Sequence, residues 1–431
     1  MTVLQQRKRT ASYGGGNEGL MKRSVVVVGG GASGLTAAVW AARSGAAVTV
    51  LEHMDRVGKK ILSTGNGRCN LTNLYMTNEC FRCGQPEFPM KVIEGFDVDA
   101  TLSFFKGLGI LPKDRQGYVY PNSDQAASVL DVLRSETAHR NVNVVCGCRI
   151  QQIKKKKDGF ELVTSEGIYR ADALILATGS KAAPVTGSDG SGYELAAGLG
   201  HRIIKPLPAL VQLRCEGKLF KQLAGVRADV ELCLLADGKP VARDKGELQL
   251  TDYGISGIPT FQISRFAAVS LDRKKKVSVV IDFLPSMSYE ETMDYLRKRV
   301  KQMNYKKCEE LLTGVLNKKL ASALMKQSGI SGESKVSSVS EEQVKNLTDQ
   351  IKKFTVKVTS TNPFENAQIC CGGVDTKEID VKTMESKLVK GLYIAGELLD
   401  VDGICGGYNL QFAWSSGALA GIHAAKGMNK V

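Results

Sequence analysis

The sequence predicts an α/β fold in which a Rossmann-like domain is split along the chain and carries a β-rich insertion followed by a helical one. Three observations predict it. A strand–helix–strand pattern occupies residues 24–52. Strand and glycine signals return after residue 355, and the stretch between them shows first strand-like and then helix-like periodicity. A chain of 431 residues also exceeds the usual size of one hydrophobic core.

The first element is "SVVVVGG", residues 24–30, a run of β-branched residues typical of a strand buried on both faces. "SGLTAAVWAARSG", residues 33–45, follows with many alanines and ends at Gly45, a residue type common just beyond a helix. "AVTVLE" then predicts a second buried strand, which ends at Glu52. The three segments form a βαβ unit.

A glycine motif lies between the first strand and the helix, as Gly29-x-Gly31-x-x-Gly34. The first glycine permits a tight turn, the second lets backbone approach a pyrophosphate, and the third lets helix and strand pack closely. The free N–H groups of the helix N-terminus favour phosphate there. Glu52 holds the position that accepts ribose hydroxyls. This context predicts an adenine dinucleotide, and an acid at 52 favours NAD or FAD over a 2′-phosphorylated cofactor.

The next region with a clear pattern is 148–179, which predicts a meander of short strands. Its apolar segments are interrupted at Asp158-Gly159 and Glu166-Gly167, dipeptides that favour tight hairpin turns. The last strand should end in "ATG" at residue 179.

Residues 199–285 predict an all-β pattern. "DVELCLLADGKPVA" has the form of a hairpin around residues 237–238, and "KVSVVIDFLP" that of a buried strand. "GSDGSG" at 187–192 resembles a phosphate loop, but no strand directly precedes it. We interpret it as a connection into a helix, so no second dinucleotide domain is expected.

The pattern becomes helical from residue 288. Ser288 with Glu291, and Ser340 with Gln343, have the spacing of a capping box, which marks the start of a helix. After residue 355, "GLYIAGE" predicts a strand and "GGYNLQFAWSSGALAGIHAA" a long helix.

Several longer motifs carry a resemblance to a known family. They are "RVGKKILSTGNGRCNLTN" after Glu52, "GELQLTDYGISGIP" at 246–259, "NAQICCGGV" at 366–374 and "GLYIAGELLDVDGICGGYNLQFAWSSG" from residue 391. Over about residues 23–431 the chain resembles the glutathione-reductase-type flavoprotein superfamily. Within it the chain resembles the bacterial YhiN/BaiN-like (aminoacetone-oxidase-like) FAD-dependent flavoproteins, which implies FAD as the cofactor.

The sequence patterns predict a domain organisation, and the resemblance implies a set of cofactor-binding residues. The expected units are a disordered extension 1–22, a first part of the FAD-binding domain 23–198, a β-rich insertion 199–286, a helical insertion 287–356 and a second part of the FAD-binding domain 357–431. The residues expected to bind FAD are Gly29, Gly31, Ala32, Ser33, Gly34, Glu52, Lys60, Arg68, Cys69, Asn70, Ile150, Thr178, Gly179, Gly396, Glu397, Gly407, Tyr408, Asn409, Leu410 and Gln411.

Within this set the family assigns positions along the cofactor. Arg68 and Asn70 are expected along the diphosphate and the flavin, and Ile150 at the adenine. Glu397 is expected near the ribityl and phosphate oxygens, and the helix start at 407–411 near the pyrimidine edge of the flavin. Backbone N–H groups there would stabilise the negative charge of reduced flavin. No side chain is assigned to catalysis, because the flavin carries the chemistry, and no metal is expected.

Eleven cysteines without regular spacing favour reduced thiols and a cytoplasmic protein. Cys80-x-x-Cys83 could be a redox dithiol beside a flavin, but we favour a chance pair because no family motif surrounds it. A zinc site is less favoured still, since no second ligand pair is evident. Cys69, Cys371 and Cys405 lie in the family motifs and are expected to be small buried residues rather than nucleophiles.

The net charge of +14 raises the question of nucleic acid. The lysine runs are scattered and not interleaved with aromatic residues, so solvated faces are favoured, and no apolar run is long enough for a membrane span. The resemblance implies an NAD(P)H-dependent reductase of C=C bonds in a small hydrophobic enone such as a dehydro-bile acid, with the nicotinamide donor bound transiently. The alternatives are an amine (aminoacetone-like) oxidase using dioxygen and an FAD-containing RNA-binding or RNA-modifying protein.

Overall fold

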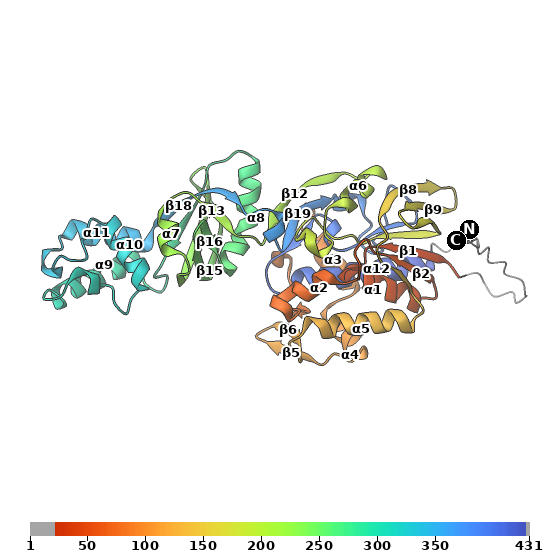
Figure 1. Ribbon diagram of the computed structural model, residues 1–431, viewed down its shortest axis with the longest axis horizontal. Helices are drawn as coiled ribbons and strands as arrows, with labels where there is room; N and C mark the ends of the chain where they lie inside the picture. The colour runs from red at the N-terminus through yellow and green to blue at the C-terminus, as the bar shows by residue number, and fades with distance from the viewer. Residues whose placement is uncertain (1–21, 428–431) are drawn as a thin grey trace, which may run out of the picture.

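The computed structural model describes residues 22–427 and is built around a five-stranded sheet (Figure 1). Its strands, in spatial order, are β20 (Leu392–Ile394), β11 (Ala173–Leu176), β1 (Ser24–Val28), β2 (Ala47–Leu51) and β7 (Asn143–Val145). Every neighbouring pair is parallel. The side chains of the two central strands β1 and β11 are almost all buried, as their run of β-branched and leucine residues predicts. The expected extension at 1–22 lies, except for residue 22, outside the described residues.

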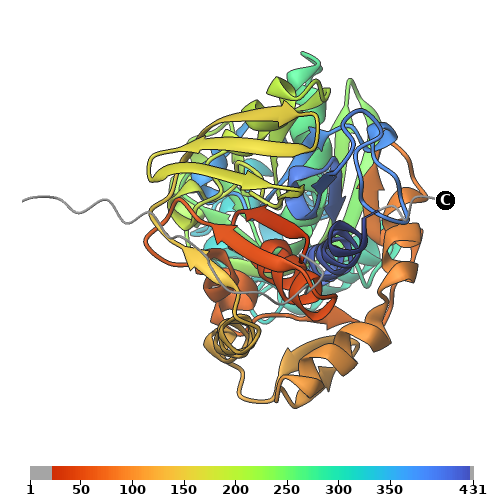
Figure 2. The same cartoon turned by 90° about the vertical axis from the view of Figure 1, so that its right-hand side faces the viewer.

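Two helices from opposite ends of the chain pack together on this sheet. They are α1 (Ala32–Arg43) and α12 (Tyr408–Lys426), which lie side by side in Figures 1 and 2. A Cβ added at Gly417 or Gly421 would lie 2.4 or 2.3 Å from a backbone oxygen of α1. Glycine is therefore required at both positions for the helices to approach, and their contact closes the split domain.

The strands after residue 148 form the predicted meander. They are β8 (Ile150–Lys156), β9 (Gly159–Thr164) and β10 (Gly167–Ala171), which pair antiparallel. Both predicted hairpins are present, with turns at residues 157–158 and 165–166, and the glycine of each predicted dipeptide starts the next strand. The chain then enters the central sheet as β11.

A closed barrel forms the second unit of the fold. Its strands, in spatial order, are β13 (Leu213–Cys215), β16 (Gly254–Ser256), β15 (Lys239–Thr251), β14 (Arg227–Ala236), β17 (Val277–Asp282) and β18 (Phe354–Thr361). The predicted hairpin at 237–238 joins β14 to β15. A two-stranded ladder of β12 (Ile203–Ala209) and β19 (Ile369–Val374) precedes and follows the barrel in sequence.

The expectation of an all-β pattern over 199–285 is wrong for residues 258–272, which form α8 (Ile258–Asp272); the short α7 (Leu219–Leu223) also lies in this stretch. Gly257, with φ 101°, and Pro259 in the first turn start α8. Its buried positions Thr260, Ile263, Ser264 and Ala267 follow helical spacing, but small and polar residues make the pattern weak in the sequence. In Figure 1, α8 stands between the barrel and the larger unit.

Three helices cover the end of the barrel that points away from the larger unit (Figure 1). They are α9 (Tyr289–Gln302), α10 (Lys318–Gln327) and α11 (Glu341–Lys352). Both predicted capping boxes are present: Ser288 exchanges hydrogen bonds with Glu291, and Ser340 with Gln343. The hydrophobic core of this unit runs continuously from the barrel strands into these helices.

The remaining elements belong to the larger unit. Its helices are α2 (Lys59–Ser63), α3 (Phe88–Gly95), α4 (Val98–Gly107), α5 (Ala126–His139) and α6 (Ser191–Gly198). Its other strands are β3 (Thr72–Asn73), β4 (Phe81–Cys83), β5 (Pro112–Arg115), β6 (Tyr118–Pro121) and β21 (Val401–Gly403). Of these, α2 and the β5–β6 hairpin border the site described below. No helix within residues 22–427 is long and apolar enough to cross a bilayer.

Candidate functional site

A cavity of about 910 Å³ opens at the carboxyl ends of the parallel strands. Residues that directly follow three of the strands line it: Gly29 after β1, Glu52 after β2 and Ala177 after β11. This edge is where open α/β sheets bind ligands, because the loops and helix N-termini converge there. The cavity then extends to α8 of the barrel unit, so both units contribute to its wall.

The glycine motif has the geometry that its sequence predicts. Gly29 has φ 101°, and a Cβ there would lie 2.5 Å from the carbonyl oxygen of Ala177. A Cβ on Gly34 would lie 1.9 Å from the carbonyl oxygen of Gly29. Around Gly31, by contrast, no described atom lies within 4 Å of an added Cβ, and no described side chain caps α1 at this residue. The first N–H groups of α1 therefore face the cavity, ready for an anion.

Glu52 lies buried at the next strand end. Its two carboxylate oxygens accept hydrogen bonds from the backbone N–H groups of Gly30 and Met54, each at 2.8 Å. Each oxygen retains a lone pair for a further donor, so the carboxylate is held in place while it can still accept a ribose hydroxyl.

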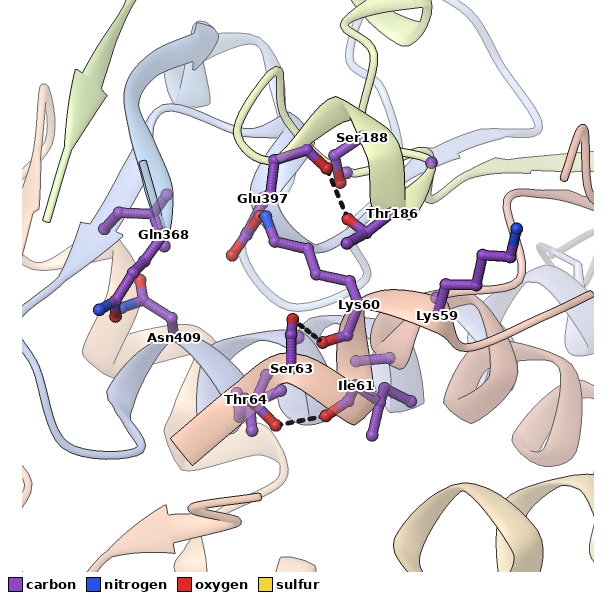
Figure 3. A pocket seen from close by; sticks show the side chains of 18 of the residues that line it. Lys59, Lys60, Ile61, Ser63, Thr64, Thr186, Ser188, Gln368, Glu397 and Asn409 are labelled. Atoms are coloured by element: carbon purple, nitrogen blue, oxygen red, sulfur yellow. Dashed lines mark hydrogen bonds and ion pairs between the residues drawn. The ribbon is translucent and has the colours of Figure 1, made fainter. Parts of the chain in front are cut away.

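An ion pair links α2 to the loop after β20. Lys60 Nζ lies 2.7 Å from Glu397 Oε2, and the Ser180 hydroxyl donates to the same oxygen at 3.2 Å. Figure 3 shows Lys60 extending from α2 toward Glu397. The predicted strand over 391–397 ends at Ile394, and Glu397 sits on a short 3₁₀ turn, Gly396–Leu398. This turn directs the carboxylate into the cavity.

The N-terminus of α12 lies at another part of the lining. Gly407 has φ 96°, and a Cβ there would lie 2.7 Å from the backbone of Thr72. The Asn409 amide accepts from Gly403 N at 2.8 Å and donates to Gly403 O at 3.0 Å, which fixes the loop before the helix. No described side chain caps α12 at Gly407, so its first N–H groups are also open to a ligand.

Two polar atoms of the lining are buried without a hydrogen-bond partner within residues 22–427. They are the side-chain oxygens of Asn70 and Thr178. Buried polar atoms are almost always paired in proteins, so these two indicate a bound polar group. Around the whole cavity the cations Arg56, Lys59, Lys60, Arg115 and Arg149 outnumber the carboxylates Glu52, Glu365 and Glu397. The cavity therefore fits a large dinucleotide with a diphosphate, such as FAD, because it offers two open helix N-termini, unpaired polar atoms and excess positive charge.

Most of the residues expected to bind FAD line this cavity. They are Gly29, Gly31, Ala32, Ser33, Glu52, Lys60, Asn70, Ile150, Thr178, Gly179, Glu397, Gly407, Asn409 and Leu410. The structure places the other expected residues outside the lining: Gly34, Arg68, Cys69, Gly396, Tyr408 and Gln411. Gly34 provides close packing, as expected. The buried amide of Gln411 binds Thr72, Thr101 and Phe96 instead of facing the cavity.

The structure adds lining residues that the sequence analysis did not single out. They are chiefly Arg115, Tyr118 and Tyr120 of the β5–β6 hairpin, Ile258, Phe261 and Gln262 of α8, and Gln368 before β19. Ile258 and Gln368 lie within the family motifs quoted above, so the motifs could have identified them as lining residues. The hairpin residues carried no such signal. The loop 187–192, interpreted as a connection, also reaches the cavity through Gly187, Ser188 and Ser191.

The cysteines of the family motifs are poor nucleophiles. Burial raises the pKa of Cys69, Cys371 and Cys405 to about 12 each, so all three thiols stay protonated at neutral pH. Cys83 belongs to β4, outside the cavity lining, and burial raises its pKa to about 11. Reactive dithiols have lowered pKa values, so the raised pKa of Cys83 favours a chance pair over a redox dithiol.

We expect the Cys80→Ser/Cys83→Ser double variant to keep the bound FAD and the turnover of the wild-type protein, because neither thiol reaches the cavity. Turnover and FAD content per chain are the measurements, and Cys146→Ser, at an exposed cysteine, is the control. Normal reduction of the bound flavin combined with lost turnover would instead identify a dithiol relay.

Outside the cavity, one group resembles the catalytic triad of a hydrolase. His201 lies 2.8 Å from Glu378 through Nδ1 and 2.9 Å from the Ser386 hydroxyl through Nε2. The His201 side chain has no exposed surface, and the Ser386 oxygen accepts the N–H groups of Leu388 and Val389. With its lone pairs engaged and no access for substrate, this serine stabilises a turn rather than acting as a nucleophile.

A buried ion pair joins α8 to the larger unit beside the cavity. Arg265 Nε donates to Asp402 Oδ2 at 2.6 Å, and the carboxylate is 4% exposed. One turn earlier on α8, the Gln262 side chain accepts the N–H of Cys405 at 3.0 Å. These two contacts fix the α8 wall against the loop that precedes α12.

Comparisons with known proteins show the family of the chain. The family model described as "HI0933-like protein Rossmann domain" matches residues 23–423. A 3-dehydro-bile acid delta(4,6)-reductase from Clostridium scindens is 45% identical over 397 residues, which are 92% of this chain and 97% of the relative. A ribosomal RNA dihydrouridine synthase from Haemophilus influenzae is 32% identical over 393 residues, 89% of this chain and 94% of the relative. The open conformation of a flavocytochrome c3 fumarate reductase aligns with a TM-score of 0.48 at 16% identity, covering 94% of this chain and 78% of that one.

Proposed function

The chain belongs to the HI0933-like family of FAD-dependent oxidoreductases, and from this premise we propose that it reduces a carbon–carbon double bond conjugated to a carbonyl group. The proposed substrate is a hydrophobic enone such as a 3-dehydro-bile acid, and NADH or NADPH is the proposed electron donor. The observation that carries the proposal is the 45% identity, over nearly the full length of both chains, to a reductase of that substrate class.

The cavity supports this assignment through the residues that would hold FAD. We propose that the N-terminus of α1 binds the diphosphate, that Glu52 accepts the ribose hydroxyls, and that Lys60 and Glu397 lie along the middle of the cofactor. The N-terminus of α12 would face the flavin, which supplies the hydride chemistry when bound. Leu210, Ile258 and Phe261 give one wall of the cavity an apolar surface, which suits a hydrophobic substrate.

A second candidate substrate is a uridine in ribosomal RNA. Dihydrouridine formation also saturates a C=C bond conjugated to a carbonyl, and a relative at 32% identity carries that name. The net charge of +14 suits a phosphate backbone. The higher identity to the bile-acid enzyme makes RNA the second choice. The names of both relatives denote reductions, so neither favours the amine oxidase that the sequence analysis left open.

The test starts from purified protein, which should be yellow and contain one FAD per chain. Under anaerobic conditions we expect NADH or NADPH to bleach the colour, and a 3-oxo-4-ene bile acid to restore it while its own enone absorbance is lost. The saturated 3-oxo bile acid is the control and should not restore the colour. Restoration by uridine-containing ribosomal RNA alone would make RNA the substrate. Bleaching by aminoacetone, with peroxide formed in air, would establish the oxidase instead.

A further inference from the structure

The β5–β6 hairpin brings a cation and two aromatic rings to the cavity next to α12. Arg115, Tyr118 and Tyr120 all line the cavity. The Tyr118 ring packs on the chain just before α12, because a Cβ added at Gly406 would lie 2.7 Å from Tyr118 Cε1. The hairpin therefore borders the part of the cavity where this helix begins.

The cations Lys113, Arg115 and Arg68 outnumber the two carboxylates of this region, Asp114 on β5 and Asp124. Lys113 and Arg115 both contact the same oxygen of Asp124, at 2.8 and 2.7 Å. Arg68 is exposed nearby and forms no ion pair in the part of the chain that the structure describes. A hydrogen bond from Lys113 and the charges of Arg115 and Arg68 lower the pKa of Asp124, so it stays ionised at neutral pH. The cluster keeps a surplus of positive charge at the cavity.

Arg115 is suited to bind a second anion. Its side chain is 41% exposed, and its guanidinium lies over the Tyr120 ring, 5.6 Å from the centroid. The contact to Asp124 uses Nη2, and its other donors have no partner among residues 22–427. A stacked guanidinium with free donors is a geometry that recognises carboxylates and phosphates.

The α8 wall of the same cavity has the opposite character. Ile258 and Phe261 are three residues apart on α8 and share one face of the helix, and Leu210 lies with them in the lining. Ile258 is 62% exposed, an unusual surface for a large aliphatic side chain at a cavity. Apolar surface left open at a pocket is typical of a ligand-binding face.

These two walls together describe one kind of ligand. Resting on the proposed reductase function, we propose that Arg115 pairs with the carboxylate of the bile-acid-like substrate, whose apolar body lies along Leu210, Ile258 and Phe261. Arg115 is then a specificity-determining residue, because it selects the ionised acid over neutral enones of the same shape.

The test compares an acid with its neutral ester. The probes are 3-oxochol-4-en-24-oic acid and its methyl ester, titrated into the oxidised, FAD-loaded protein without nicotinamide. Binding is followed by the change in flavin absorbance, which requires no turnover. We expect the acid to bind the wild-type protein roughly tenfold or more tightly than the ester, the effect of one charge-assisted contact. Arg115→Gln should weaken the acid to the level of the ester and leave the ester unchanged.

Two variants control for indirect effects. Arg227 is also exposed and ion-paired, to Glu247 at 2.8 Å, but lies on the barrel outside the cavity lining, so Arg227→Gln should not change either affinity. Arg115→Lys keeps the charge without the planar fork and should give an intermediate affinity for the acid. An unchanged Tm of Arg115→Gln would show that its weaker binding of the acid is a local effect and does not come from partial unfolding.

The outcomes separate this inference from the proposed function. If the wild-type protein binds and reduces acid and ester equally well, the reductase stands and the role of Arg115 is wrong. If Arg115→Gln leaves the affinity for the acid unchanged, Arg115 does not bind the carboxylate and the inference is also wrong. If neither steroid changes the flavin spectrum while an RNA oligonucleotide binds through Arg115, both the substrate class and the proposed function are overturned.

Discussion

Gly34→Ala is expected to give a protein that retains no FAD and unfolds far more easily than the wild type. An added Cβ would lie 1.9 Å from the carbonyl oxygen of Gly29 and 3.0 Å from its carbonyl carbon. Both are backbone atoms, which no rotamer change can move, so α1 must shift away from the loop after β1. Overpacking costs about 1–3 kcal/mol and occasionally more, and a clash with backbone atoms belongs at the upper end of that range, above the ~1 kcal/mol that alanine gains over glycine in a helix.

Two matched glycine variants separate the fold from the cofactor. Gly31→Ala places its methyl group where no described atom lies within 4 Å, but inside the cavity, so we expect a normally folded apoprotein that binds FAD weakly. Gly107→Ala, at the end of α4, meets no described neighbour and should change neither property. FAD per chain after gel filtration and the Tm of the apoproteins are the measurements. A Gly34→Ala apoprotein with the wild-type Tm would contradict the packing argument.

Arg265→Met is expected to destabilise the protein by about 3–5 kcal/mol at pH 8, because it leaves the buried Asp402 carboxylate without its partner. Burial raises the pKa of Asp402 to about 6, and Arg265 opposes that rise. Since the folded-state pKa lies above the unfolded one, ionised Asp402 destabilises the fold above about pH 6, and protonation relieves this as the pH falls. Removing Arg265 raises the pKa further, so the loss of stability should be much smaller at pH 5 than at pH 8.

The measurement is the free energy of unfolding of the apoprotein in urea at both pH values. Asp402→Asn combined with Arg265→Met completes a double-mutant cycle and should recover part of the loss at pH 8. The nearby Asp400 is also buried, with a raised pKa, and Arg82 adds positive charge, so the cycle should be run at each pH. An equal loss of stability at pH 5 and pH 8 would mean that the packing of the Arg265 side chain, and not its charge, holds α8 in place.

Local patterns predicted the parts of the fold that local interactions decide. The Gly29–Gly34 motif sits between strand and helix because its glycines alone permit the turn and the close packing. The capping boxes at Ser288 and Ser340 form between residues three positions apart, and the hairpins follow from their turn dipeptides. Motif resemblance added the cofactor, FAD, and 14 residues of the cavity lining.

Local patterns failed where distant segments decide the structure. α8 has small and polar residues on its buried face, and it forms because it packs against β15 and β12. Gln411 lies in the expected helix start, yet its amide turns inward to satisfy Thr72 and Thr101. Arg68 belongs to a cofactor motif but lies exposed outside the cavity lining.

The sequence by itself determined the family, the FAD-binding βαβ unit and the residues at its strand ends, because each rests on backbone geometry encoded within a few residues. Only the tertiary structure decided what surrounds the part of the cavity between the β5–β6 hairpin and α8. The β5–β6 hairpin and the α8 wall come from distant segments of the chain, and the Arg265–Asp402 pair joins residues 137 positions apart. Their contacts depend on how the barrel packs against the Rossmann-like unit, and no local propensity records that packing.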